Sequence, residues 1–406
     1  MCVSRLTMAG LLVFENRLDD AERETRRLVA DFPDWPSAWN GYSELLAGRG
    51  RWDEAIAAAE RARLAASGDP WYAFEPARRL VEAGRYDEAA RRLRPWLHAR
   101  DREMALAAAD VEAARLRELG RHREAVQVLM MATRATGPAP TAYDLVRGAS
   151  LAALGDARAA EQAYATPPPR LDQRRTADDW LLNQDARLFT WSRALLADAL
   201  VVAADARGEQ PDTVRLRALA DSMETIGGQS YFARDWRLHH HVRGLIAARA
   251  GRWTEAVAEF QQARWTRTGW TRTLVELARA ELGAGHPDRA LAALADARGA
   301  VLNSMGRYAT RTEIALWTAR AYEAAGQLDS AQAYADVVRR AWRDADPPVR
   351  RRLAWLPAEG REVDNPQPRG RQHTAPTLGR GPVTRASSRL PETPSGYMSG
   401  TPGPRR

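Results

Sequence analysis

Apolar residues are grouped along this chain in paired segments that are separated by short polar turns. Trp39 to Ala47 forms one such segment, a turn follows at Gly50, and Ala55 to Ala66 forms the next. Both segments are rich in Ala, Leu and Glu, which favour helices. The pattern therefore predicts a helix, a tight turn and a second helix.

The turn recurs as a Gly followed five positions later by Ala. Gly50-Arg51-Trp52-Asp53-Glu54-Ala55 is repeated 34 residues later at Gly84, and again 36 residues after that at Gly120. The pairs in this frame are Gly50 with Ala55, Gly84 with Ala89, Gly120 with Ala125, Gly155 with Ala160, Gly251 with Ala256, Gly285 with Ala290, and Gly326 with Ala331. Asn16 with Ala21 is an eighth pair, in which Asn replaces Gly.

Helix geometry explains both positions of the frame. A helix that ends in the left-handed conformation favours Gly, and Asn is the next most tolerant residue. The Ala begins the second helix where two helices cross closely, and a larger side chain there would overpack the contact at a cost of roughly 1–3 kcal/mol. A period near 34 residues made of two helices indicates a helical solenoid.

These residues resemble the tetratricopeptide repeat (TPR) family, and the resemblance covers most of residues 2–345. Consensus positions are occupied by Pro33, Trp39, Gly50, Ala55, Ala62, Gly148, Gly244, Phe260, Ala263, Ala319 and Tyr322. Several repeats lack the consensus Pro, and the spacing widens between Gly155 and Gly251. The resemblance implies an all-α, right-handed superhelical solenoid.

The chain divides into four expected regions. About five repeats occupy residues 2–165, a linker interrupted by Thr166 to Pro169 occupies 166–186, and about four repeats occupy 187–346, the first of them degenerate around Gly208. An Arg-, Pro- and Gly-rich tail occupies 347–406, and we expect disorder from about residue 358. A misread gene end would have the same composition. Because residues 2–34 lack a polar capping helix, the chain is expected to be the C-terminal part of a longer polypeptide.

Charge and cysteine content indicate the class of partner and the cellular compartment. The net charge is +8, and the region from Pro347 onward holds eleven Arg against four acidic residues, so the repeats are close to neutral. Nucleic-acid binding through the repeats is therefore not expected, although the tail could bind nucleic acid. Cys2 is the only cysteine, and the apolar run from Ala9 to Phe14 is too short for a signal peptide or a membrane span. A cytoplasmic protein that does not contact membranes is expected.

Residues for catalysis or metal binding are scarce. The chain contains no Lys, which excludes phosphate-loop and Schiff-base lysines. His239, His240 and His241 are consecutive, so on a helix they point about 100° apart and do not converge on a metal. Cys2 lies at a terminus, and the adjacent Asp178 and Asp179 have no partnered base. The sequence predicts no enzyme, no cofactor and no metal site.

The TPR resemblance places ligand contacts on the first helix of each repeat. Its second, fifth, ninth and twelfth positions line the concave face and give Asn40, Glu44, Trp71, Phe74, Arg78, Asp110, Arg117, His241, Arg272, Arg279, Glu313 and Arg320. Arg78, Arg279 and Arg320 share the ninth position, where Arg could bind a carboxylate or phosphate, or could simply solvate the helix. Trp71 and Phe74 could anchor an apolar side chain. The Lys and Asn pattern of the chaperone-tail carboxylate clamp is not reproduced.

The expected function is a protein- or peptide-binding scaffold without catalysis. The resemblance suggests the sensor or partner-binding region of a bacterial signalling or transcription-regulatory protein. The segment from Gly228 to Trp236 is a second candidate, either as a binding loop or as packing across a joint between two sub-arrays. The alternative function is nucleic-acid association through the Arg-rich tail. The sequence predicts neither the partner's identity nor the oligomeric state.

Overall fold

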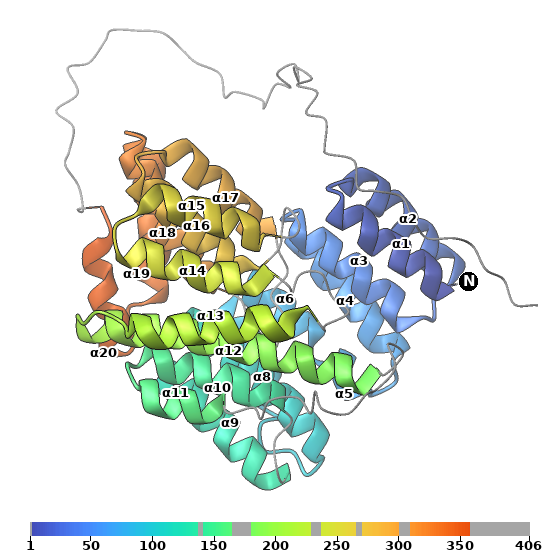
Figure 1. Ribbon diagram of the computed structural model, residues 1–406. Coiled ribbons are helices and arrows are strands. Elements are labelled where there is room, and N and C mark those ends of the chain that lie inside the picture. Colours follow the sequence, from blue (N-terminus) through green and yellow to red (C-terminus); the bar gives the residue numbers. More distant parts are fainter. Residues whose placement is uncertain are drawn as a thin grey trace, which may run out of the picture. The chain divides into compact units, whose positions relative to one another are not determined.

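The chain is described by a computed structural model that covers residues 2–136, 141–164, 180–228, 237–264, 270–299 and 309–357. These residues belong to one compact unit, residues 1–359. The predictions about Thr166 to Pro169, Asp178 and Asp179, most of the Gly228–Trp236 segment, and residues 358–406 lie outside the described residues. Every regular element in the described part is helical (Figure 1), so the predicted all-α class is confirmed.

The helices follow one another in antiparallel pairs. The first part of the chain contains α1 (Cys2–Phe14), α2 (Leu18–Asp31), α3 (Pro36–Gly48), α4 (Trp52–Ala65), α5 (Pro70–Ala73), α6 (Glu75–Glu82), α7 (Tyr86–Leu93), α8 (Arg102–Glu118), α9 (His122–Thr136), α10 (Thr141–Ala153) and α11 (Ala157–Ala163). The second part contains α12 (Trp180–Arg207), α13 (Thr213–Gly227), α14 (Leu238–Arg249), α15 (Trp253–Ala263), α16 (Thr271–Gly283), α17 (Pro287–Gly299), α18 (Arg311–Ala324), α19 (Leu328–Ala341), α20 (Pro347–Arg350) and the 3₁₀ helix η2 (Arg351–Trp355).

The repeated turns share one backbone conformation. Gly50 has φ +73°, its N–H donates to the Ala47 carbonyl at 2.9 Å, and the Arg51 N–H donates to the Leu46 carbonyl at 3.0 Å. This pattern closes a helix on a left-handed residue. The other frame glycines and Asn16 also have positive φ. The Ala of each frame is fully buried, which applies to Ala21, Ala55, Ala89, Ala125, Ala160, Ala256, Ala290 and Ala331.

The Arg after the frame Gly has a partner that sequence reasoning did not identify. Arg51 pairs with Glu54, and Arg85, Arg121 and Arg252 repeat the contact with the acidic residue three positions later. These pairs are mostly exposed, and such pairs contribute about 0.2–1 kcal/mol each. The Gly-Arg-x-x-Glu-Ala motif thus combines a turn, an ion pair at the helix start and a close crossing.

Two local features depart from a regular array. The α5–α6 pair is broken at Phe74 because Pro76 enters the first turn of α6 and cannot continue the hydrogen-bond ladder. The helix α12 begins at Trp180, whereas the sequence predicted an irregular linker over residues 166–186. The degenerate repeat around Gly208 consists of α12 and α13.

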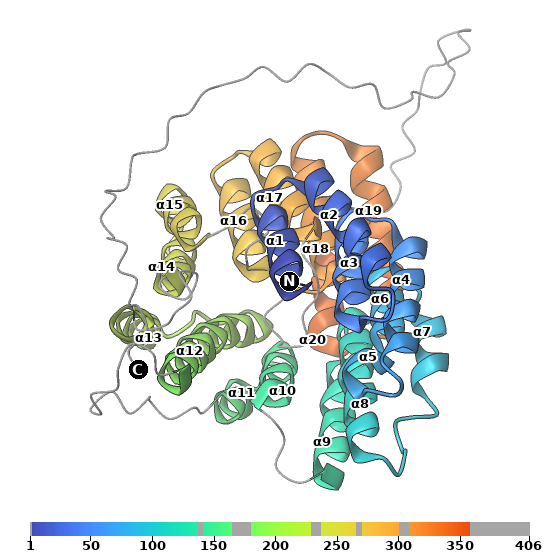
Figure 2. The same cartoon turned by 90° about the vertical axis from the view of Figure 1, so that its right-hand side faces the viewer.

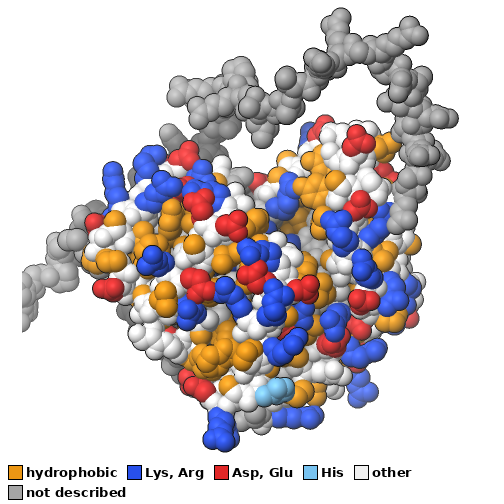
Figure 3. Space-filling model, turned by 180° about the vertical axis from the view of Figure 1, so that it is seen from behind, with side chains coloured by type: hydrophobic (Ala, Val, Ile, Leu, Met, Phe, Trp, Pro, Cys, Tyr) orange, Lys and Arg blue, Asp and Glu red, His pale blue; other side chains and the backbone are white. Residues whose placement is uncertain are grey.

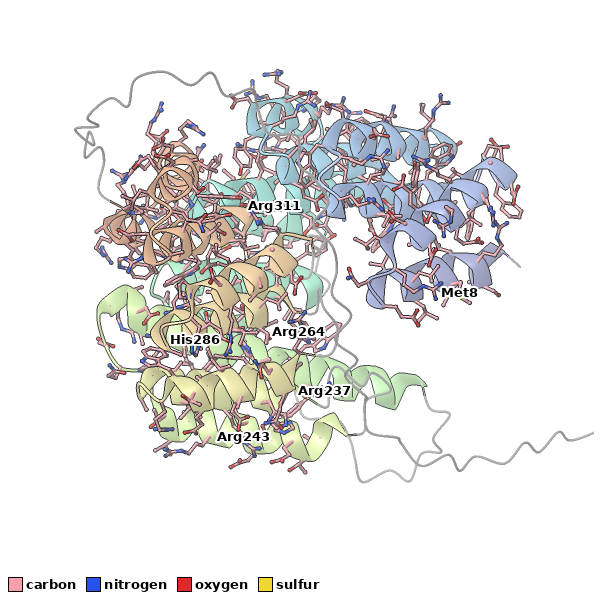
Figure 4. All side chains as sticks on the ribbon, turned by 90° about the horizontal axis from the view of Figure 1, so that it is seen from above. Met8, Arg237, Arg243, Arg264, His286 and Arg311 are labelled. Atoms are coloured by element: carbon pink, nitrogen blue, oxygen red, sulfur yellow. The ribbon has the colours of Figure 1, made fainter. Side chains whose placement is uncertain are left out.

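The array curves back on itself within this unit. The helix α18 contacts α8, and α17 contacts α3 (Figures 1 and 2). Arg311 lies in this region (Figure 4), with its guanidinium 4.7 Å from the centroid of the Trp52 ring. The backbone N–H of Arg311 donates to the Glu118 carboxylate at 2.9 Å. The contact between residues 118–123 and residues 311–349 is called the closure contact below.

Candidate peptide-binding surface

The first helices of successive repeats contact one another as well as their own partners. The contacts run from α3 to α6, α6 to α8, α8 to α10, α10 to α12, and onward through α14 and α16 to α18, and the short α5 contacts both α6 and α8. We call this group the inner helices. Polar side chains on one inner helix pair with polar side chains on the next, so the site is built from bridges between repeats.

The bridge between α6 and α8 is formed around Arg78. Its guanidinium donates to Glu75 at 2.9 Å and to Asp110 at 3.0 Å. Arg79, which is almost fully buried, donates to Glu75 and Glu82 at 2.8 and 2.6 Å. Burial acts to raise the pKa of Glu75, but Arg78 and Arg79 outweigh it and lower that pKa. Burial raises the pKa of Asp110 in spite of Arg78.

The His241 side chain links three inner helices in the second half. His241 Nε2 lies 2.8 Å from Asp198 Oδ1 on α12, and His241 Nδ1 lies 3.1 Å from Thr273 Oγ1 on α16. His241 is only 2% exposed. When Nε2 donates to the carboxylate, Nδ1 accepts from the hydroxyl, so both ring nitrogens are satisfied. This arrangement makes His241 a structural bridge.

The last bridge joins α16, α18 and η2 through Glu313. Arg272 donates to both Glu313 oxygens at 2.9 and 2.8 Å, and Arg352 donates to one of them at 2.9 Å. Burial acts to raise the pKa of Glu313, but the charges of Arg272 and Arg352 outweigh it and hold the pKa well below its ordinary range. Arg279 pairs with Glu276 at 2.8 Å, and its guanidinium lies 4.7 Å from the centroid of the Trp317 ring.

Residues 347–357, which we call the strap, lie against α18. Arg320 Nη1 donates to the Trp355 carbonyl at 2.7 Å, and Arg339 Nη2 donates to the Pro357 carbonyl at 2.5 Å. The rings of Trp355 and Trp317 have centroids 5.9 Å apart. The inner face of the last repeat therefore already holds a segment of chain.

Cavities lie beside several of these bridges. One of about 170 Å³ is lined by α12, α16, α18 and the strap, and includes Arg279, Asp205 and Trp355. Another of about 70 Å³ is lined by Arg117 and His122 among other residues. Burial, followed by the charge of Arg117, lowers the pKa of His122 to about 3, so this imidazole is neutral at physiological pH.

The residues proposed from the sequence fall into two groups. Phe74, Arg78, Asp110, Arg117, His241, Arg272, Arg279 and Glu313 are buried or largely buried within the unit. Asn40, Glu44, Trp71 and Arg320 are at least partly accessible, and Trp71 is 70% exposed. Trp71 and Phe74 do not form one anchor, because Phe74 packs in the core against Trp96. Arg320 differs from Arg78 and Arg279 in remaining exposed while it holds the strap carbonyl.

Sequence reasoning did not identify the partners of these arginines. Glu75 and Glu276 lie three positions before Arg78 and Arg279, so a helical Glu-x-x-Arg pattern could have found them. Arg352 and Trp355 stand in a region assigned to the tail, and their aromatic and aliphatic neighbours were the available signal. No local sequence pattern indicates partners that are distant in the chain, such as Asp198 for His241.

Positive and negative side chains are interspersed over the face in Figure 3. Within the described ranges, no group of three or more His, Cys, Asp or Glu residues could hold a metal ion. Among the helices of those same residues, none is both long and apolar enough to cross a membrane.

Comparisons with solved structures return helical repeat proteins at low similarity. The TPR domain of P58(IPK) is 14% identical over 87% of this chain and 96% of that chain, with a TM-score of 0.22. The Cut9–Hcn1 hetero-tetramer of the APC/C gives 12% identity over 87% and 83%, with a TM-score of 0.26. Human IFIT1, in a dimer with PPP-AAAA, gives 14% identity over 85% and 73%, with a TM-score of 0.38. No curated protein matches the sequence.

The family comparison covers the first two helix pairs. Residues 6–70 match the model described as tetratricopeptide repeat. The same positive-φ turn and buried Ala continue through Gly326 and Ala331, far beyond the matched range. Residues 6–70 therefore match the TPR family, and the resemblance predicted from the sequence is confirmed for that range.

Proposed function

We propose that this chain is a non-catalytic scaffold that binds a segment of a partner protein along its inner helices. The strap carries this proposal, because its two short helical turns, α20 and η2, are held against the last repeat through side chains and backbone carbonyls. Backbone recognition of this kind suits a peptide, since every peptide offers the same carbonyls. The cytoplasm is the proposed compartment.

The accessible inner positions of the first half are the proposed contact for that partner. Trp71 is 70% exposed, and an exposed Trp is a common interface anchor. Glu44, which accepts from the Asn40 amide at 3.2 Å, would add negative charge beside the peptide.

A peptide library displayed on phage, selected against the full chain, tests the proposal. Peptides that bind the inner helices of the first half should bind the Trp71→Ala variant at least tenfold more weakly, while its melting temperature stays unchanged. Trp96→Ala is the matched control, because Trp96 is also partly exposed but packs on the core residue Phe74. Failure to recover any binding peptide, or equal binding by all three proteins, would refute the scaffold.

Nucleic-acid binding through the tail remains the second candidate function. The observation that favours it is the surplus of Arg beyond Pro347. Deleting residues 358–406 separates the two functions, because the deletion leaves the strap and every described helix in place. Loss of salt-sensitive oligonucleotide binding on this deletion, with peptide binding absent from both forms, would favour the second function.

A further inference from the structure

We propose that the strap is an intramolecular ligand that covers the inner face of the last repeat, and that this face binds partner segments carrying Arg three residues before Trp. This inference rests on the proposed function and specifies its partner and its regulation. The strap supplies that spacing itself, in Arg352 and Trp355. The partner would displace the strap from α18.

The two ends of the strap are buried in the core, whereas its middle is only partly buried. Val349 is 2% exposed and packs with Trp342 and Ala345, so the start of the strap belongs to the core. Arg352 and Trp355 are only partly buried, and Ala354 between them is exposed. Leu356, which is 8% exposed, belongs to the same core cluster as Val349. Only the middle of the strap, residues 351–355, can therefore leave α18 while Val349 and Leu356 stay in place.

The receptor side is a cation site with an aromatic wall. Glu313 already receives two hydrogen bonds from Arg272, so Arg352 is a second guanidinium on the same carboxylate. The Arg352 guanidinium carbon lies 5.2 Å from the ring centroid of Trp342, and 5.2 Å from that of Trp355. A guanidinium from another chain could take this place and keep the Glu313 and Trp342 contacts.

The aromatic and backbone contacts determine the distance along the bound segment between its Arg and its Trp. The Trp355 ring lies 5.9 Å from the Trp317 ring and is tilted against it by 43°. The Trp355 carbonyl accepts from Arg320, which lies at the ninth position of the inner helix. Because the carbonyl contact is independent of sequence, specificity comes from the Arg and the Trp alone. Lys would fit less well, since it cannot present a planar guanidinium between two rings.

The strap fills this face incompletely. A cavity of about 170 Å³ remains between the strap and the helices α12 and α16, bordered by Val202, Asp205 and Arg279. A partner residue that fills this space would gain packing that the strap lacks. A partner segment can therefore compete with an attached ligand, although the strap has the advantage of high effective concentration.

Competition can be measured with the full chain and a synthetic peptide. The probe is a fluorescein-labelled peptide with the sequence of residues 346–358, and the release variant carries Arg352→Ala with Trp355→Ala. Fluorescence anisotropy should show the peptide binding the release variant at least tenfold more tightly than the unchanged chain. The same peptide with Ala in place of its Arg and Trp should not bind.

Controls separate strap release from general loosening. Arg340→Ala with Trp96→Ala removes an exposed Arg and a partly exposed Trp away from the strap, and should leave peptide binding as weak as in the unchanged chain. If the release variant does not fold, excess peptide added to the unchanged chain should accelerate amide exchange in residues 351–355. Absence of that acceleration would overturn the inference.

The remaining outcomes are also decisive. Equal peptide affinity for the release variant and the unchanged chain overturns the inference, as does equal binding of the Ala-substituted peptide. If these results occur while Trp71-dependent binding of library peptides persists, only the strap inference fails. If both kinds of binding are absent, the proposed scaffold function fails as well.

Discussion

The Glu118 carboxylate, at the end of α8, accepts hydrogen bonds from both the backbone N–H and the hydroxyl of Thr312, each at 3.0 Å. Thr312 lies in the first turn of α18, 194 residues further along the chain. The carboxylate therefore caps the N-terminus of a distant helix, where a negative charge is favoured. Asp346 returns the contact by accepting from the Arg123 N–H in the first turn of α9 at 2.9 Å.

This reciprocal capping predicts that Glu118→Ala destabilises the unit. Glu118 is fully buried, so its removal leaves the N–H groups of Arg311 and Thr312 without their acceptor. The expected loss is about 2–3 kcal/mol in the free energy of unfolding. Urea denaturation monitored by circular dichroism measures it, and Glu54→Ala, which removes an exposed partner of Arg51, should change stability by less than about 1 kcal/mol. Equal midpoints for the two variants would show that the cap contributes nothing.

Two frame glycines should respond differently to the same substitution. Gly50 and Gly120 both have positive φ, at +73° and +68°. A Cβ at Gly50 would meet nothing within 4 Å, whereas a Cβ at Gly120 would lie 2.7 Å from the Ala345 Cβ. Gly50→Ala should therefore cost only the backbone term of about 1–2 kcal/mol. Gly120→Ala should cost at least about 1 kcal/mol more, because it also overpacks the closure contact.

Amide hydrogen exchange locates the additional cost at Gly120. Faster exchange should appear at residues 342–349 in Gly120→Ala but not in Gly50→Ala. The prediction fails if the two variants melt at the same temperature, or if the exchange of residues 342–349 is unchanged in both. Either result would mean that the closure contact adapts to a methyl group without loss.

Replacing the arginines at the ninth position of the inner helices should cost different amounts of stability. Arg78→Ala leaves the carboxylates of Glu75 and Asp110 without their shared partner, and breaking a buried pair costs about 3–5 kcal/mol. Arg320→Ala removes an exposed side chain that donates to the Trp355 carbonyl, and should cost less than about 1 kcal/mol. Thermal melts of the two variants give the comparison, and similar losses would contradict the assignment of Arg78 to the core network.

The local part of this fold was predictable from the sequence, while the contacts between distant repeats were not. Gly50 and Ala55 specify a turn and a crossing that depend on residues close in sequence. The partner of Glu118 depends instead on how small rotations between many repeats accumulate, which no local pattern encodes. The inner-helix positions were found by resemblance, but burial of Arg78 and Arg272 depends on acidic residues of the neighbouring repeat.

Burial of His122 should make the free energy of unfolding depend on pH. This dependence should begin near pH 6.5, above the range in which carboxylates usually titrate. The pKa of His122 is lowered to about 3 by burial, whereas an unfolded His protonates near pH 6.5. Below about pH 6.5 the unfolded state thus binds the extra proton, and folding stability falls as the pH falls towards 3. Well inside this window the slope is about 1.4 kcal/mol per pH unit.

Replacing His122 isolates this contribution from the other titrating groups. The urea midpoint of the unchanged chain, measured from pH 7 to pH 5, should fall more steeply than that of His122→Gln, and the difference between the two curves removes the effect of His239, whose pKa is also lowered by burial. His98→Gln is the matched control, because His98 is exposed and should leave the slope unchanged. Parallel curves for all three proteins would mean that His122 takes up its proton as readily in the folded chain as in the unfolded one.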